Sequence, residues 1–133
     1  MQGERNLDRL LASLEPVQRP GTFVFAVVED AALLGAVVPD ATVREEEGLT
    51  VVLRREEADR LGVAYDHVGA WITLRVHSAL DAVGLTAAVS AALAGAGLSC
   101  NVIAGYHHDH LLVPADRAHE AITVLAGMSR DQT

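Results

Sequence analysis

Cysteine is nearly absent from the sequence, and lysine is absent altogether. The single cysteine, Cys100, has no partner for an intrachain disulfide and cannot form a cysteine-type zinc site. A chain without a disulfide framework is most simply placed in a reducing compartment, so we expect a cytoplasmic protein. The 10 basic residues are outnumbered by 18 acidic residues, which gives a net charge of −8. We expect no nucleic-acid partner, because such a surface needs clustered positive charge.

Long apolar runs are also missing. No uninterrupted apolar segment approaches the roughly 20 residues of a membrane-spanning helix, so we expect no membrane partner. The first 16 residues are charged from Glu4 onward and do not build the apolar region of a signal peptide. The chain nevertheless has a large apolar share, 50% of its 133 residues. That share is enough for a packed core and excludes a disordered acidic segment.

Charge is divided unevenly along the chain. Residues 1–66 hold 13 acidic and 7 basic residues. Residues 67–133 hold only 5 acidic and 3 basic residues, together with all six histidines. The length allows one ordinary domain or two very small ones. We predict two lobes, an N-terminal lobe of residues 1–66 and a C-terminal lobe of residues 67–133, with the seam near residues 63–70.

Apolar spacing predicts the elements of the first lobe. A short amphipathic helix follows the i, i+3, i+4, i+7 pattern of Leu7, Leu10, Leu11 and Leu14, with Asn6 as its N-cap. Residues 22–29 are apolar on both alternating faces, which is typical of a strand that is covered on both sides. The remaining predicted elements are a short helix over 31–38, a hairpin over 41–56 that turns at 46–48, and a helix over 56–62.

The second lobe shows the same order of elements. Its predicted elements are a strand over 69–78, a helix over 84–97, strands over 98–106 and 109–114, and a helix over 115–128. In the first of these strands, Ile72, Leu74 and Val76 face one way and Thr73, Arg75 and His77 the other. We therefore predict an α+β protein of two ferredoxin-like lobes, with antiparallel sheets and helices on one face. The strand over 69–77 can close the first lobe or open the second, so this pattern leaves one strand to be shared or swapped between the lobes.

One long stretch resembles a known family. The segments "HSALDAVGLTAAV", "NVIAGYHHDH" and "LLVP" follow one another within residues 71–114, and "TVREEEGLTVVL" occupies residues 42–53. In this order and spacing the sequence resembles the bacterial tandem ACT-like proteins, which are related to the ACT domains that sense amino acids. The resemblance covers roughly residues 10–126. It implies two ACT-like βαββαβ lobes in a regulatory, ligand-binding protein, commonly a homodimer, with no catalytic chemistry and no cofactor.

The resemblance also implies a site for an amino acid or a similar small polar metabolite at the interface between lobes. ACT domains use the loop between the first strand and the first helix of a lobe, together with the edge of the second strand. In this sequence the implied ligand-binding residues are Ser78, Ala79, Leu80, Asp81, Val83, Gly84, Leu85 and Thr86 in the loop, and Asn101, Val102 and Ile103 in the strand.

The chemistry of these residues suits a free amino acid. The ligand carboxylate would accept hydrogen bonds from the backbone N–H groups of residues 84–86, at the positive end of a helix dipole. The ammonium would bind Asp81 or backbone carbonyl groups, and Asn101 can both donate and accept. A purely structural interpretation also fits, because Ser78 and Asp81 match a helix-capping pattern and Gly84 suits a turn.

A histidine-rich segment, residues 107–110, suggests a metal site. His108 and His110 are two apart in an extended segment, so their imidazoles project from the same face and could chelate. Zinc needs three or four ligands, and His77 or His119 would have to come from elsewhere in the fold. His108 and His110 are therefore weak candidates for metal ligands.

The position of this segment favours a different structure. It lies between two predicted strands, which is typical of a β-hairpin with its turn near residues 106–108. Two alternatives to the ligand-binding hypothesis stay open. One is a ligand-free protein interaction module that pairs through its sheet edges, and the other is a small metal-dependent enzyme that uses the histidine cluster of residues 107–110.

Overall fold

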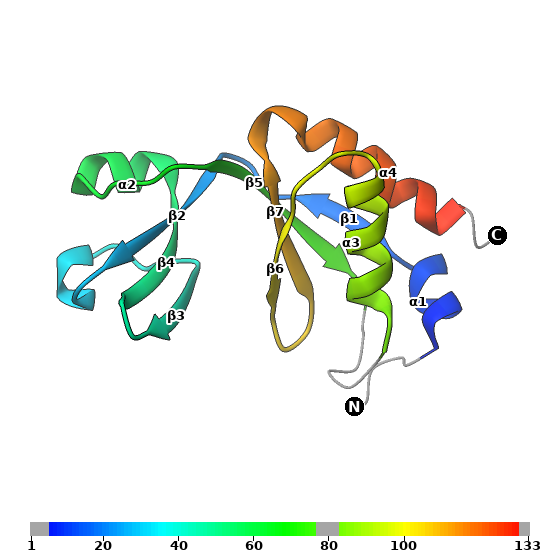
Figure 1. Cartoon of the computed structure of the whole chain (residues 1–133), viewed down its shortest axis with the longest axis horizontal. Helices are drawn as coiled ribbons and strands as arrows, with labels where there is room; N and C mark the ends of the chain where they lie inside the picture. Colours follow the sequence, from blue (N-terminus) through cyan, green and yellow to red (C-terminus); the bar gives the residue numbers. More distant parts are fainter. Residues whose placement is uncertain (1–5, 77–82, 131–133) are drawn as a thin grey trace. The chain divides into compact units, whose positions relative to one another are not determined.

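The computed structural model describes residues 6–76 and 83–130 (Figure 1). The chain forms two compact units. Unit 1 contains the residues up to Arg19 and those from Ala70 onward, and unit 2 contains Pro20–Gly69. Each unit combines antiparallel strands with helices, as the predicted α+β class requires. The division of the sequence into lobes at residues 66 and 67 stays a prediction. In the described residues no helix is both long and apolar enough to cross a membrane.

Unit 2 is built on a small antiparallel sheet. Its elements are β2 (Phe23–Val28), the 3-10 helix η1 (Ala31–Leu34), β3 (Ala41–Glu45), β4 (Gly48–Arg54) and α2 (Arg55–Leu61). The strands lie in the order β3-β4-β2, and the first two residues of β5 (Val68–Arg75) pair with β2. The predicted hairpin is confirmed, with Glu45 paired to Gly48 across the turn. The predicted helix over 31–38 is only a 3-10 helix, because Gly35 ends it with φ +59.

One face of this sheet carries the core of unit 2. Leu34 of η1 and Ala58 of α2 pack against alternate residues of β2 and β4. The strand residues in this core are Val24, Ala26, Val28, Val51 and Leu53. The side chains between them point to the opposite face, because successive residues of a strand alternate.

Unit 1 is a four-stranded sheet with helices gathered beside it (Figure 1). Its elements are α1 (Leu7–Ala12), β1 (Glu15–Gln18), β5 from Ala70, α3 (Leu85–Gly95), β6 (Asn101–Ala104), β7 (Asp109–Pro114), the 3-10 helix η2 (Ala115–Arg117) and α4 (Ala118–Arg130). The strand order is β1-β5-β7-β6. Buried residues of β5 and β7, among them Ile72, Leu74, Leu111 and Val113, pack against the three α-helices. Ile72, Leu74 and Val76 face one way as predicted, and the structure places all three in this core.

The first described segment of the chain closes this sheet. Asn6 caps α1 as predicted, with its side-chain oxygen accepting a hydrogen bond from the Arg9 N–H at 3.1 Å. Strand β1 then pairs antiparallel with β5, so that Val17 lies opposite Thr73. The sequence pattern does not predict β1, because only four residues, one of them proline, form it. The fourth strand of unit 1 therefore comes from the N-terminal part of the chain.

An arginine ties the two long helices of unit 1 together. The Arg117 guanidinium donates to the carbonyl oxygens of Gly97 at 2.9 Å and Ala96 at 3.1 Å, and it also pairs with Glu120. These carbonyl groups lie at the C-terminal end of α3, where a helix leaves its acceptors unsatisfied. A positive charge is also favoured there by the helix dipole.

A glycine in the hairpin of unit 2 gives a test of the fold. Gly48 has φ +147, and a Cβ there would lie 2.9 Å from Val27 Cγ1 and 3.0 Å from the Val28 carbonyl oxygen. We expect Gly48→Ala to lower the free energy of unfolding by about 2–4 kcal/mol, because strain and a backbone clash add. Gly62→Ala is the matched control, since Gly62 also has a positive φ, +72, in the left-handed helical region, but open space around it. It should cost about 1 kcal/mol in the same urea titration. Equal losses in the two variants would contradict this account of the hairpin.

Candidate functional site

The predicted ligand loop is only partly within the described residues. Ser78, Ala79, Leu80 and Asp81 lie outside them. The rest of the loop leads into α3. Val83 is 82% exposed, Gly84 is the N-cap, and Leu85 is buried in the core of unit 1. Thr86 is exposed on the first turn of α3. The N-terminus of α3 thus presents backbone N–H groups beside small or outward-facing side chains.

Gly84 has a structural reason to be glycine. Its φ is +103, a left-handed conformation that other residues rarely adopt. A Cβ at this position would lie 3.1 Å from Leu7 Cδ2 of α1. The space beside Gly84 is therefore filled by α1, and the turn into α3 depends on this glycine whether or not a ligand binds there.

The three predicted strand residues form most of β6. Asn101 and Val102 are exposed and Ile103 is half-buried, on the strand at the edge of unit 1's sheet. Figure 1 shows that β6 runs toward the end of this sheet at which α3 begins. At roughly 3.3 Å per residue along a strand, Ile103 lies closer to that end than Asn101 does. Within one unit, a ligand at the start of α3 is therefore nearer to Ile103 than to Asn101.

A polar and aromatic cluster lies on the face of unit 1's sheet that is turned away from the core. The Trp71 indole N–H donates to Thr73 Oγ1 at 3.1 Å, and Thr73 Oγ1 is hydrogen-bonded to His110 Nδ1 at 2.9 Å. The Trp71 and His110 rings are 5.1 Å apart, and the Arg19 guanidinium lies 4.8 Å from the Trp71 ring. Ile103 pairs with His110 across the hairpin, so a predicted ligand residue adjoins this cluster.

Burial and charge govern the titration of this cluster. Burial lowers the pKa of His110, and the neighbouring His108 and Arg19 lower it further, against an opposing effect of Asp109. Burial raises the pKa of the Asp109 carboxyl, and His110 and His108 oppose that shift. The net effect favours the neutral form of His110, whose ring is tilted by 44° against the Trp71 ring.

The histidine-rich segment forms the predicted hairpin between β6 and β7. The Gly105 N–H donates to the His108 carbonyl oxygen at 2.9 Å and closes the turn. His108 Nδ1 is buried and has no hydrogen-bond partner in the described part of the chain. His110 already uses Nδ1 on Thr73. Among the described residues, no three histidine, cysteine or acidic side chains lie together as a metal site would require.

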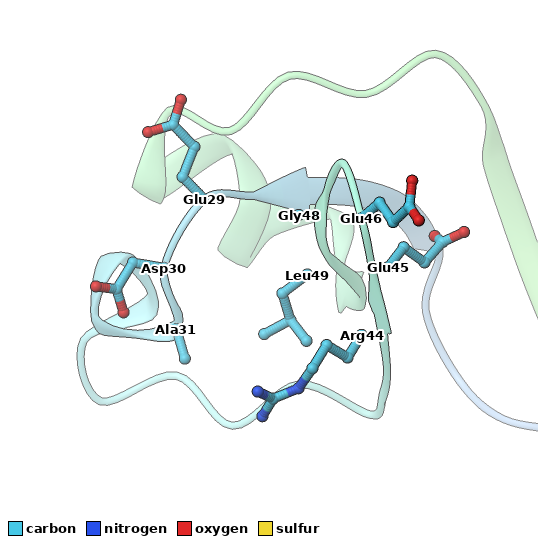
Figure 2. A pocket seen from close by; sticks show the side chains of 8 residues that line it. All are labelled: Glu29, Asp30, Ala31, Arg44, Glu45, Glu46, Gly48 and Leu49. Atoms are coloured by element: carbon cyan, nitrogen blue, oxygen red, sulfur yellow. The ribbon is translucent and has the colours of Figure 1, made fainter.

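A hollow in unit 2 lies between the loop after β2 and the β3–β4 hairpin. Its volume is about 420 Å³, within the usual range for small-molecule sites. The lining residues are Glu29, Asp30, Ala31, Arg44, Glu45, Glu46, Gly48 and Leu49. Figure 2 shows Leu49 in the middle of the hollow and the Arg44 side chain reaching across it, with the carboxylates around the rim. No local pattern in the sequence points to these residues as a site, because a loop and a hairpin meet here only in the fold.

The charges of this hollow are of both signs. In the described residues the Arg44 guanidinium has no ion-pair partner. The Asp30 carboxylate accepts from the Ala32 N–H at 2.9 Å, and the Glu45 carboxylate accepts from the Thr50 hydroxyl. An arginine that faces a cavity can bind a carboxylate through two parallel hydrogen bonds. The acidic rim provides acceptors for an ammonium group.

The titration of His110 gives a second test. A pKa below its ordinary value of 6.5 means that the folded chain binds the proton less readily than the unfolded chain. The contribution of His110 to the free energy of unfolding is therefore fully present above pH 6.5 and is lost as the pH falls below it. We expect unfolding at pH 5.5 to require less urea than at pH 7.5, and His110→Asn to reduce this difference while keeping an acceptor for Thr73. His107→Asn, at an exposed position, should leave it unchanged. An unaltered pH dependence in His110→Asn would refute the assignment.

Comparison with known proteins agrees with the sequence resemblance. Residues 2–70 and residues 67–127 each match a family model described as an ACT domain. The structure is similar to that of a protein of unknown function from Vibrio cholerae, described as a possible transport protein. That protein shares 44% sequence identity over 92% of this chain and 95% of its own, with a TM-score of 0.85. A search of curated proteins finds no match.

Similarity at low identity extends to other solved structures and concerns the fold alone. A protein from Agrobacterium tumefaciens is 19% identical over 87% of this chain and 89% of its own, with a TM-score of 0.65. The ligand-free regulatory subunit of aspartate kinase from Thermus thermophilus is 8% identical over 87% of this chain and 96% of its own, with a TM-score of 0.64. The fold is therefore the ferredoxin-like ACT fold that the sequence predicted. With two ACT matches that together span residues 2–127, this chain belongs to the ACT domain family.

Proposed function

We propose that this chain is a regulatory protein that binds an amino acid or a similar small polar metabolite. Membership of the ACT family supports a role in sensing amino acids. The observation that carries the proposal is the hollow of unit 2, because it combines a suitable volume with an arginine and carboxylates. A protein of this kind acts by binding, so we propose no catalytic activity.

The position of the hollow supports this use. The resemblance to ACT-like proteins implies a ligand site made by the loop after the first strand of a lobe and by the second strand. In unit 2 the first strand is β2, and the loop residues Glu29–Ala31 line the hollow. The second strand is β3, which ends at Arg44 and Glu45 beside them. The hollow thus uses the same two elements as the predicted site, but in the other half of the chain.

A zwitterionic ligand fits the groups around the hollow. Arg44 would donate to the ligand carboxylate, since a guanidinium can form two parallel hydrogen bonds with it. Asp30 and Glu29 would accept from the ammonium group at the rim. Leu49 and Ala31 would contact the side chain of the ligand, which favours a small and largely apolar one.

We also propose the predicted site at α3 as a second binding site for the same class of ligand. It comprises the start of α3 from Val83 to Thr86, with Asn101–Ile103 of β6, and the predicted loop residues 78–81. The N-terminal turn of α3 offers backbone N–H groups to a carboxylate. Binding at an interface between lobes, assembly as a homodimer and a cytoplasmic location also stay predictions.

The test is a thermal-shift and calorimetry panel of the twenty amino acids. We expect at least one to stabilise the protein, and Arg44→Gln to weaken its binding by about ten-fold or more, because a charged hydrogen bond is lost. Arg60→Gln is the matched control. Arg60 is an exposed arginine of α2, 3.9 Å from Glu57 and not among the lining residues, so binding should be unchanged.

The outcomes separate the two sites. If an amino acid binds equally well to the wild type and to Arg44→Gln, the hollow is not the site and the α3 position becomes the candidate. If no amino acid stabilises the protein at millimolar concentration, the amino-acid form of the proposal is wrong. A stoichiometric protein partner without any small-molecule response would then favour the interaction module, and stoichiometric metal in untagged protein would favour the metal-dependent enzyme.

A further inference from the structure

The charges around the hollow of unit 2 do not balance. The residues that line it include one arginine, Arg44, and four acidic residues, Glu29, Asp30, Glu45 and Glu46. If Arg44 binds the carboxylate of an amino acid, as in the proposed function, the positive charge of the hollow is used. The charged groups that then remain around the ligand are all acidic.

Two of the four carboxylates are already engaged within unit 2. Asp30 accepts a hydrogen bond from a backbone N–H at 2.9 Å, and Glu45 accepts one from a hydroxyl group. In the described residues Glu29 and Glu46 have no hydrogen-bond or ion-pair partner. The proposed function uses Glu29 as an acceptor for the ligand ammonium. Glu46 has no part in those contacts, although it lines the hollow.

The hairpin turn sets the position of Glu46. The pairing that closes the β3–β4 hairpin leaves Glu46 and Glu47 as the two residues of the turn, and both are exposed. Of these two, Glu46 lines the hollow and Glu47 does not. Figure 2 shows Glu46 and Arg44 on opposite sides of Leu49. A ligand with its carboxylate at Arg44 and its side chain over Leu49 therefore directs the end of that side chain toward Glu46.

We propose that Glu46 makes the hollow selective against dicarboxylic amino acids, that is, against aspartate and glutamate. The inference rests on the proposed function, because it takes the hollow as the amino-acid site. A second carboxylate on the ligand would meet the like charge of Glu46, and no second cationic side chain is among the residues of unit 2 that line the hollow. The side-chain amides of asparagine and glutamine have nearly the same shape but no charge, and they can donate to a carboxylate.

The selectivity comes from repulsion and not from additional contacts. A repulsive group placed against one class of ligand is a common source of specificity. Neutral and cationic side chains are not repelled by a carboxylate, so the exclusion concerns the dicarboxylic class alone. Because Glu46 is exposed, the repulsion acts partly through solvent and is screened by salt. The discrimination is therefore largest at low ionic strength.

The test is calorimetric titration with two pairs of ligands, asparagine with aspartate and glutamine with glutamate, at low ionic strength. In at least one pair we expect the wild type to bind the amide about ten-fold more tightly than the acid, because like charges oppose binding. Glu46→Gln should reduce this ratio by about three-fold and leave the affinity for the amide nearly unchanged. Glu47→Gln is the matched control. It removes the same charge from the next position of the turn, outside the lining residues, so the ratio should stay that of the wild type.

The outcomes distinguish this inference from the proposed function. Added salt should narrow the ratio of the wild type. Equal binding of amide and acid by the wild type would overturn the selectivity while the proposed function holds. A ratio that changes equally in Glu46→Gln and Glu47→Gln, or in neither, would overturn it as well. A wild type that binds neither amide also contradicts the selectivity, and the proposed function fails with it when none of the other amino acids binds.

Discussion

The pairing of β1 with β5 is the interaction on which unit 1 depends. Four residues near the start of the described chain align with Ile72–Arg75 and supply the strand beside β5. The connection is reinforced by the helices, since the Ser129 hydroxyl of α4 donates to the Ala12 carbonyl oxygen of α1 at 2.8 Å. Leu10, Leu11 and Leu14 are buried in the same core as α3 and α4. Both ends of the described chain therefore stabilise one unit, and unit 2 is an insertion in the sequence of unit 1.

Most elements could be predicted because their apolar spacing is local. The alternation in β5, the period of α1 and the glutamate turn of the hairpin each specify one structure within a few residues. Strand β1 could not be predicted in this way. Glu15 and Gln18 are exposed, and Pro16 suggests the end of a helix. Only its hydrogen bonds to a strand more than fifty residues away make this segment a strand.

The site was predictable in part for the same reason. Gly84 stands out in the sequence, and the structure gives it a left-handed turn against Leu7. The bond between Thr73 and His110 joins residues 37 positions apart, and no pattern in either segment points to the other. The hollow of unit 2 likewise needs a loop and a hairpin to meet. Sequence patterns identify elements well, but a site made by two elements depends on their packing.

The arginine clamp of unit 1 has a consequence for how the two sides of that unit respond to their surroundings. Arg117 joins α3 to α4 through a group that stays protonated throughout the physiological range. On the far side of the sheet, the corresponding side-chain link between β5 and β7 passes through the imidazole of His110, whose pKa is lowered by burial. Protonation of His110 at low pH therefore costs free energy in the folded chain, whereas the charge of the Arg117 clamp does not change. The helical side of unit 1 is thus held by a group whose charge is independent of pH, and the opposite side by a group whose charge depends on pH.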